Sequence, residues 1–241
     1  KELFKANGLD LVATWEEIIK YLDASDAEGV VEGTVAAVAL KEDPLGSLKN
    51  QKIRRNFYAQ CEELAEKIEA ADLSNGRKLL DNVNKPFTQG VSDYLTKASA
   101  AKWRLMVRST GKEDTKELPN AGGNHTEPNV TPEIEAVLAG AKKVVASYFK
   151  PKSLEQRRTA GDKSLFGTPL IPVLLQRMIG EPIGGVKQVR DVPVGCVVYS
   201  AESEGQTKNV VVVQGAWGHP EIVVNNEGFI DTFFVRKTDG A

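Results

Sequence analysis

Hydrophobic residues recur at helical spacing through the first hundred residues of the chain. In the clearest stretch, which follows a candidate cap at Ser47, they lie three or four positions apart: Ile53, Phe57, Cys61, Leu64 and Ile68. This spacing gathers the apolar side chains on one face of a helix and predicts that this face is core.

The rest of this region is also predicted to be helical. Thr14 and Glu17 have the spacing of a capping box, which predicts that a helix begins at Thr14. The Val- and Ala-rich residues 29–40 fit a helix or a strand, and we favour a helix. A further helix is expected over residues 88–100. Residues 1–100 are therefore predicted to form a helical region that carries no chemistry of its own.

Beyond this region the pattern changes to short apolar strands. They are expected at residues 105–107, just after 124, and at 171–178, 194–199, 209–214 and 229–236. The third of these, IPVLLQRM, is a short apolar run bounded by prolines and polar residues and is predicted to be buried. Before it, Thr131 and Pro132 predict the N-cap and first position of a helix. The fold class is thus α+β, with a helical N-terminal part followed by a mostly antiparallel sheet and packed helices.

Composition excludes some partners and leaves others open. The chain has 241 residues, and its 31 basic residues nearly balance 33 acidic ones, so nothing favours nucleic acid or an anionic membrane as a partner. No apolar run approaches the roughly 18 residues that a membrane span needs. The two cysteines, Cys61 and Cys196, are predicted to be free thiols in a reducing compartment.

The segment that begins at Trp103 carries the candidate chemistry. A short strand delivers Arg108, a planar cation with several donors, and Ser109 and Thr110 then supply two hydroxyl groups. An Arg and small hydroxyl residues before a polar loop are suited to holding a polyphosphate. On composition alone, an ordinary surface hairpin with Arg108 in an ion pair is the simpler interpretation. The glycines of GEPIGG, residues 180–185, do not add a phosphate loop, because the Lys-Ser/Thr partner is absent; a Gly-Pro turn between strands is expected there.

A family resemblance favours the phosphate interpretation. The run RLMVRSTGKEDTKELPNAGGNHTEPNV resembles the phosphate-binding segment of the pyruvate/phosphoenolpyruvate-binding, ATP-grasp domain, with its V-R-S-S-A, L-P, A-G, Thr and N-V elements. That domain occurs in phosphoenolpyruvate synthases, pyruvate phosphate dikinases, glucan water dikinases and rifampicin phosphotransferases. Downstream, VVASYFKPKSLEQRR, IPVLLQRM and NVVVVQGAWGHPEIVVNNEGFIDTFFVRK are similar to later runs of the same family.

The resemblance implies a set of site residues. Arg108, Ser109, Thr110 and Thr126 would hold phosphates, Gln176 and Met178 would lie near the adenine, and Glu221 would bind Mg²⁺, with Asp231 and Asn225 as weaker ligand candidates. Met178 as a plain core residue and Glu221 as a solvent-facing turn residue are the alternatives. Arg108 and Glu221 are expected to face each other across a phosphate cleft and to carry catalysis. Residues 101–241 would be the nucleotide-binding subdomain, and residues 1–100 a helical cap.

The same resemblance implies a function. Mg-ATP would give a phosphoryl group to a histidine on another domain, and from there to pyruvate or a similar acceptor; a glucan water dikinase is the enzymatic alternative. The phosphohistidine and acceptor-binding domains would be partners outside this chain. The family's glycine-rich turn reads Gly218-His219-Pro220-Glu221 here, which favours a second alternative, a non-catalytic module that serves as an interaction surface. The cytoplasm is the expected location, or a plastid for a eukaryotic dikinase, and an incomplete first lobe predicts self-association.

Overall fold

The chain forms two compact units, residues 1–177 and residues 178–241. The structure is a computed structural model. It describes residues 2–26, 51–76, 78, 85–110, 123–159, 162, 165–169, 171–179, 181–183, 186–190, 194–200, 209–224 and 226–237. The predictions for residues 29–40, Ser47 and Asn225 lie outside the described residues. The functional division expected near residue 100 stays a prediction.

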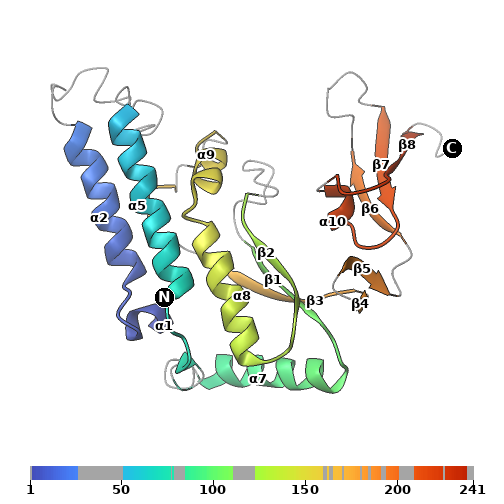
Figure 1. The fold of residues 1–241 in the computed structure, drawn as a ribbon, viewed down its shortest axis with the longest axis horizontal. Coiled ribbons are helices and arrows are strands. Elements are labelled where there is room, and N and C mark those ends of the chain that lie inside the picture. Colours follow the sequence, from blue (N-terminus) through green and yellow to red (C-terminus); the bar gives the residue numbers. More distant parts are fainter. Residues whose placement is uncertain are drawn as a thin grey trace. The chain divides into compact units, whose positions relative to one another are not determined.

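The first unit combines helices with one three-stranded sheet (Figure 1). Its helices are α1 (Glu2–Ala6), α2 (Leu11–Asp26), α5 (Gln51–Ala70), α7 (Lys85–Ala100), α8 (Ile134–Ser147) and α9 (Pro151–Thr159), and its strands are β1 (Leu105–Ser109), β2 (Thr126–Val130) and β3 (Val173–Arg177). The strand order is β2-β1-β3, and both pairings are antiparallel. The predicted α+β class and the strands on either side of residues 111–122 are confirmed.

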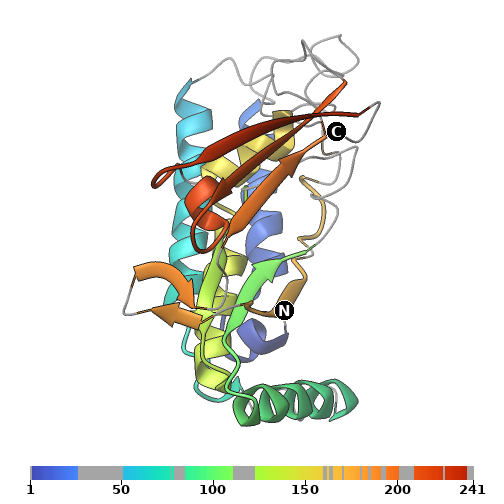
Figure 2. The same ribbon diagram turned by 90° about the vertical axis from the view of Figure 1, so that its right-hand side faces the viewer.

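The helical layer of this unit encloses an aromatic core. Helix α5 packs against both α2 and α8 (Figures 1 and 2). The Trp15 ring lies 5.2 Å from the Phe149 ring and 6.3 Å from the Phe57 ring, measured between centroids. The stripe predicted on α5 is confirmed where it is described, because Phe57, Cys61, Leu64 and Ile68 are all at most 1% exposed.

Two predicted helix starts were wrong. Helix α2 begins at Leu11, before Thr14. Asp10 is its cap, since its Oδ1 accepts hydrogen bonds from the backbone N–H groups of Val12 and Ala13, each at 3.2 Å. The hydrogen bond from Ala13 is the largest of the causes that lower the pKa of the Asp10 carboxyl, and the bond from Val12 lowers it further. Thr14 instead lies in the first turn and donates its hydroxyl to the Asp10 carbonyl.

The second error concerns helix α8. It begins at Ile134 with Glu133 at the N-cap position, and no side chain caps it. The Thr131 hydroxyl donates to the Glu133 carboxylate at 3.2 Å rather than to a backbone N–H group. A sequence pattern for a cap lists groups that can bond, but the backbone turn decides which of them reach the helix end.

The second unit is built from strands and one short helix. Its elements are β4 (Glu181–Ile183), β5 (Val186–Arg190), β6 (Gly195–Tyr199), β7 (Val210–Ala216), α10 (Glu221–Val224) and β8 (Asp231–Arg236). Strands β4 and β5 form a two-stranded sheet, and the other three form a sheet of order β6-β7-β8. The three predicted Val-rich strands are therefore confirmed, and all their pairings are antiparallel.

The described residues 181–183 are a strand and not part of the turn that the sequence predicted over 180–185. Glu181, Pro182 and Ile183 are strand β4, paired with β5. The pairing is irregular between Pro182 and Ile183, which fits a proline that has no N–H group to give to the ladder. Strand β5 was not predicted.

Candidate nucleotide-binding face

Alternation along β1 divides the first sheet into a covered and an open face. Leu105 and Val107 are fully buried, whereas Met106 and Arg108 are half-buried. Helix α8 covers the Val107 face, because a side chain added at Gly140 of that helix would lie 3.2 Å from Val107 Cγ2. Neighbouring strand residues point to opposite sides, so Met106 and Arg108 lie on the face that α8 does not cover.

The register of the neighbouring strands brings two more predicted residues to this open face. Arg108 pairs with Thr126 of β2 on one side and with Leu174 of β3 on the other. Met106 pairs with Gln176. Residues directly opposite in an antiparallel pair share a face. The open face therefore carries a cation, a hydroxyl, an amide and two apolar side chains, and we call these five residues the open-face set: Met106, Arg108, Thr126, Leu174 and Gln176.

Strand β3 is therefore less buried than predicted. Residues 171–178 were expected to form a buried strand, but Leu174 is 40% exposed and Gln176 is exposed. An uninterrupted apolar run cannot distinguish a strand covered on both sides from one covered on one side only. Here the strand has one open face, and this is what leaves Gln176 available to a ligand.

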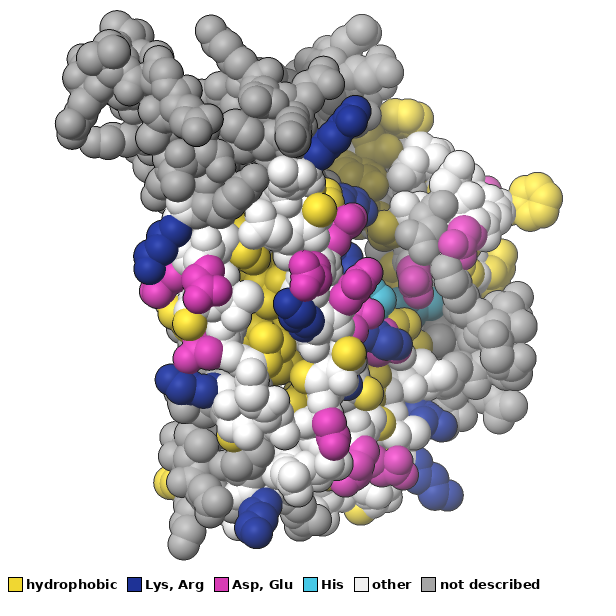
Figure 3. All heavy atoms as spheres, turned by 60° about the vertical axis from the view of Figure 1, so that its left-hand side comes forward, with side chains coloured by type: hydrophobic (Ala, Val, Ile, Leu, Met, Phe, Trp, Pro, Cys, Tyr) yellow, Lys and Arg dark blue, Asp and Glu magenta, His cyan; other side chains and the backbone are white. Residues whose placement is uncertain are grey.

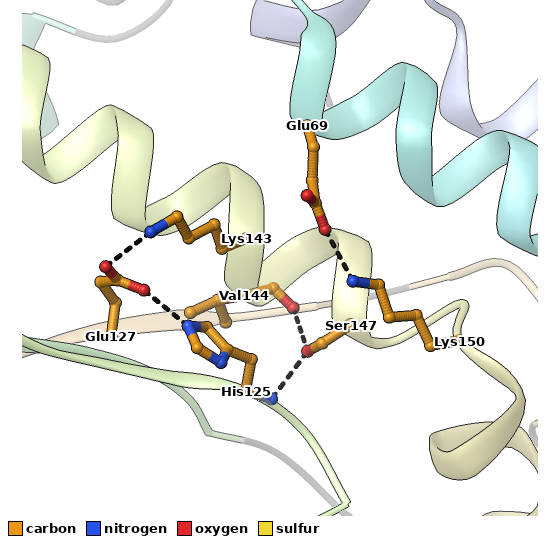
Figure 4. Close-up of polar contacts among 7 residues, drawn as sticks. All are labelled: Glu69, His125, Glu127, Lys143, Val144, Ser147 and Lys150. Carbon is orange, nitrogen blue, oxygen red and sulfur yellow. Dashed lines mark hydrogen bonds and ion pairs between the residues drawn. The ribbon is translucent and has the colours of Figure 1, made fainter.

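Two buried hydroxyl groups fix the start of β2, and Figure 4 shows the one that belongs to Ser147. Ser147 of α8 accepts a hydrogen bond from the His125 backbone N–H at 2.8 Å and donates to the Val144 carbonyl. Ser153 of α9 is fully buried and donates to the Asn124 side chain at 2.7 Å. The strand is thus tied to two helices just before Thr126. Sequence reasoning missed both serines, because short polar residues in helices carry no signal of the strand that they hold.

The Glu127 carboxylate forms a network on the covered side of β2 (Figure 4). Its two oxygens lie 2.6 Å from His125 Nε2 and 2.7 Å from Lys143 Nζ of α8. Partial burial raises the pKa of Glu127, but the bonds from His125 and Lys143 outweigh it, so the pKa lies below its usual value. Glu127 pairs with Val107, so this network belongs to the α8 side and not to the open-face set.

Ser109 and Thr110 do not join Arg108. Ser109 pairs with Val173 and by alternation points to the same side as Val107. Thr110 is exposed, and its backbone N–H donates to the Pro172 carbonyl at 3.1 Å. Met178 is buried, at 6% exposure, and belongs by contacts to the second unit. The roles predicted for these three residues remain predictions.

The candidate metal ligands of the second unit lie on different sides of its sheet. Asp231 pairs with Gly215 and shares its face with Cys196. A side chain added at the adjacent Gly195 would lie 2.5 Å from the Pro220 nitrogen, so the chain that leads into Glu221 lies over the opposite face. The Glu221 backbone N–H donates to His219 Nδ1 at 3.3 Å. Among the described residues, no three His, Cys, Asp or Glu side chains cluster as a metal site.

The surface of the first unit has two further features. An apolar hollow of about 480 Å³ lies against Phe4, Phe149 and Ile171, and the described residues that line it are all uncharged. On the face drawn in Figure 3, the described basic and acidic side chains are interspersed over the helices of the first unit. Within the described part of the chain, no helix has both the length and the hydropathy of a membrane span.

Comparison with known protein families identifies a relationship that covers most of the chain. The family model described as pyruvate phosphate dikinase, AMP/ATP-binding domain, matches residues 8–241. A search of the curated proteins returned none that matches. The matched range covers both units and includes all the candidate site residues.

Proposed function

Because the chain belongs to the family of the pyruvate phosphate dikinase AMP/ATP-binding domain, we propose that the open face of the β2-β1-β3 sheet binds ATP for phosphoryl transfer. The family establishes a nucleotide-binding domain of the dikinase type. The location of the nucleotide, the route of the phosphoryl group and its acceptor are our proposal. The single observation that supports the location is the register that aligns Thr126, Arg108 and Leu174 across three strands.

The chemistry of the open-face set suits a nucleotide. Arg108 offers a permanently charged, planar donor group that can hold two phosphate oxygens at once. Thr126, on β2, lies directly opposite Arg108, and its hydroxyl can donate a hydrogen bond to the same phosphate. Two residues back along β1, Met106 lies opposite Gln176. Met106 offers an adaptable apolar surface to a purine ring, and the Gln176 amide can bond to the polar edge of that ring.

Magnesium would accompany ATP. Glu221 and Asp231 lie on opposite faces of their sheet, so they do not make a shared two-carboxylate site. Mg²⁺ is often held by one carboxylate together with phosphate oxygens and water, and Glu221 alone fits that arrangement. When bound, the ion would neutralise charge on the phosphates. Asn225 lies outside the described residues and Asp231 remains the weaker candidate.

We further propose that the phosphoryl group passes to a histidine on another domain and then to pyruvate or a similar acceptor. The support for this step is the family alone, because neither of the chain's two histidines belongs to the open-face set. His125 bonds to Glu127 on the covered side of β2, and His219 precedes α10 in the second unit. Arg108 would act by charge neutralisation and positioning, which carry most of the catalysis in phosphoryl transfer.

Calorimetric titration of the chain with Mg-ATP tests the proposal. We expect saturable binding, weakened about 10- to 100-fold in Arg108→Ala, since hydrogen bonds to charged groups contribute roughly 1.5–3 kcal/mol. Arg177→Ala is the matched control. Arg177 is in β3 of the same sheet, pairs with Leu105 and stacks on the Trp103 ring at 4.7 Å. Absent binding would favour a non-catalytic module, and equal losses in the two variants would refute the open face as the site.

A further inference from the structure

Strand β8 is an apolar edge strand of the second unit. It pairs with β7 on one side only, and among the described residues no strand lies on its other side (Figure 1). All six of its residues are exposed, including Phe233 at 57% and Phe234 at 62%. An exposed, hydrophobic edge strand presents unpaired N–H and C=O groups together with apolar side chains, and both favour pairing with another strand.

We infer that β8 pairs with β8 of a second copy of this chain, antiparallel and about a twofold axis. The axis stands perpendicular to the sheet, and the two three-stranded sheets join as β6-β7-β8-β8-β7-β6. The self-association expected from the sequence concerned an incomplete first lobe. This interface is at a different place, on the edge of the second unit's sheet.

The symmetry restricts the register. A twofold axis perpendicular to the sheet keeps each face of one copy on the same side as that face of the other. Residues directly opposite in an antiparallel pair point to one side, so a residue can pair only with itself or with residues an even number of positions away. The axis must therefore pass through a residue, and the two registers nearest the strand's centre place it at Phe233 or Phe234.

The side chains favour the register centred on Phe234. There Phe234 meets its own copy, Phe233 lies opposite Val235, and Asp231 lies opposite Lys237, which directly follows the strand. The centre is then apolar, and an acid faces a base at both ends, which favours cross-strand pairing. With the axis at Phe233, Asp231 would lie opposite Val235 and would have no cation across from it. Charge complementarity therefore selects both a second copy as partner and its register.

Long-range charge does not oppose this contact. The chain has a net charge of −2, so two copies repel each other only weakly at ordinary ionic strength. A contact made by one strand per copy lies at the small end of specific interfaces. We therefore expect a dimer whose population rises with protein concentration.

Sedimentation of the 241-residue chain over a range of concentrations tests the interface. The wild type should form dimers, and Phe234→Lys, which places two like charges at the axis, should weaken association about tenfold or more. Phe229→Lys is the matched control: it makes the same change in the same unit, outside β8, at a ring that is fully exposed. A wild type that stays monomeric, or equal losses in both variants, would overturn the proposal.

Cysteine pairing tests the register. In a Cys196→Ser background, Phe234→Cys should form an intermolecular disulfide, since facing residues in an antiparallel pair have Cα atoms about 4.5–5.5 Å apart, within the range of disulfides. Phe233→Cys and Phe229→Cys should cross-link much more slowly.

Charge reversal is a second test of the register. Asp231→Lys should weaken the dimer, and adding Lys237→Asp should restore it. Faster cross-linking at residue 233, or no rescue by the second charge change, would refute the register centred on Phe234.

Discussion

The two units treat their large apolar side chains differently. Residues 1–177 bury Trp15, Phe57 and Phe149 at 1% exposure or less, whereas residues 178–241 leave Trp217 75% exposed and Phe234 62% exposed. Several helices packed against a sheet can enclose aromatic rings. The described elements of the second unit, two small sheets and a four-residue helix, cannot cover both faces of its larger sheet. The first unit is stabilised by its interior, and the second presents surface that suits contacts with other molecules.

The two cysteines give the largest expected difference between the units. Cys61 is fully buried on α5, and burial raises the pKa of its thiol far above the usual value, whereas Cys196 on β6 is exposed. Cys196 should react with a thiol reagent in the native protein. Cys61 should react at least about 10³-fold more slowly, because it needs the core to open. Absorbance of the released chromophore measures both rates, and equal rates would refute the buried position of Cys61.

Removing one aromatic ring from each unit compares how much a buried ring and an exposed ring contribute to stability. Phe149→Ala should lower the free energy of unfolding by about 3–5 kcal/mol, because it leaves a cavity beside Trp15. Phe233→Ala, at a ring 57% exposed, should lower it by less than about 1 kcal/mol. Denaturant unfolding, monitored by tryptophan fluorescence, measures both values. Similar losses would mean that the second unit depends on its surface rings as much as the first depends on its core.

A buried ion pair gives the next effect. Arg157 of α9 lies 2.8 Å from the Asp162 carboxylate with both side chains buried, and its guanidinium lies 4.0 Å from the Tyr148 ring centre. Asp162→Asn should destabilise the chain by about 3 kcal/mol, since it leaves a buried cation without its counter-charge. Lys67→Gln is the control, because it removes an exposed pair with Glu63, and it should cost less than about 1 kcal/mol. Equal costs would contradict the burial of Arg157.

The smallest expected effect is the pH dependence of the Glu127 network. The pKa of Glu127 is lowered in the folded state, so its contribution to stability is present above the carboxyl's usual pKa and is lost as pH falls through the lower folded value. Glu127→Gln should therefore cost a few tenths of a kcal/mol at neutral pH and almost nothing at an acidic pH below the folded-state pKa. Denaturant unfolding at both pH values measures the difference. If the destabilisation by Glu127→Gln grew as the pH fell, it would contradict a lowered pKa of Glu127 in the folded state.

Several local features could be predicted because they depend on short-range pattern. The stripe on α5, the strand that carries Arg108 and the three Val-rich strands all follow from residue spacing. The helix starts at Leu11 and Ile134 could not be predicted, since several polar residues compete as caps and backbone geometry chooses among them. The exposure of Leu174 also could not be predicted, because it depends on which face of β3 another element covers.

The residue pattern was sufficient to place the chain in a nucleotide-binding family with an α+β fold, and to put Arg108 near the end of a strand. The residues that accompany Arg108 depend on how the strands pair. Thr126 and Gln176 reach its face because β1 pairs in a fixed register with β2 and β3, whereas Ser109, its neighbour in the chain, points away. The physical reason is the two-residue period of a strand, which separates neighbours in sequence and aligns residues across hydrogen-bonded strands.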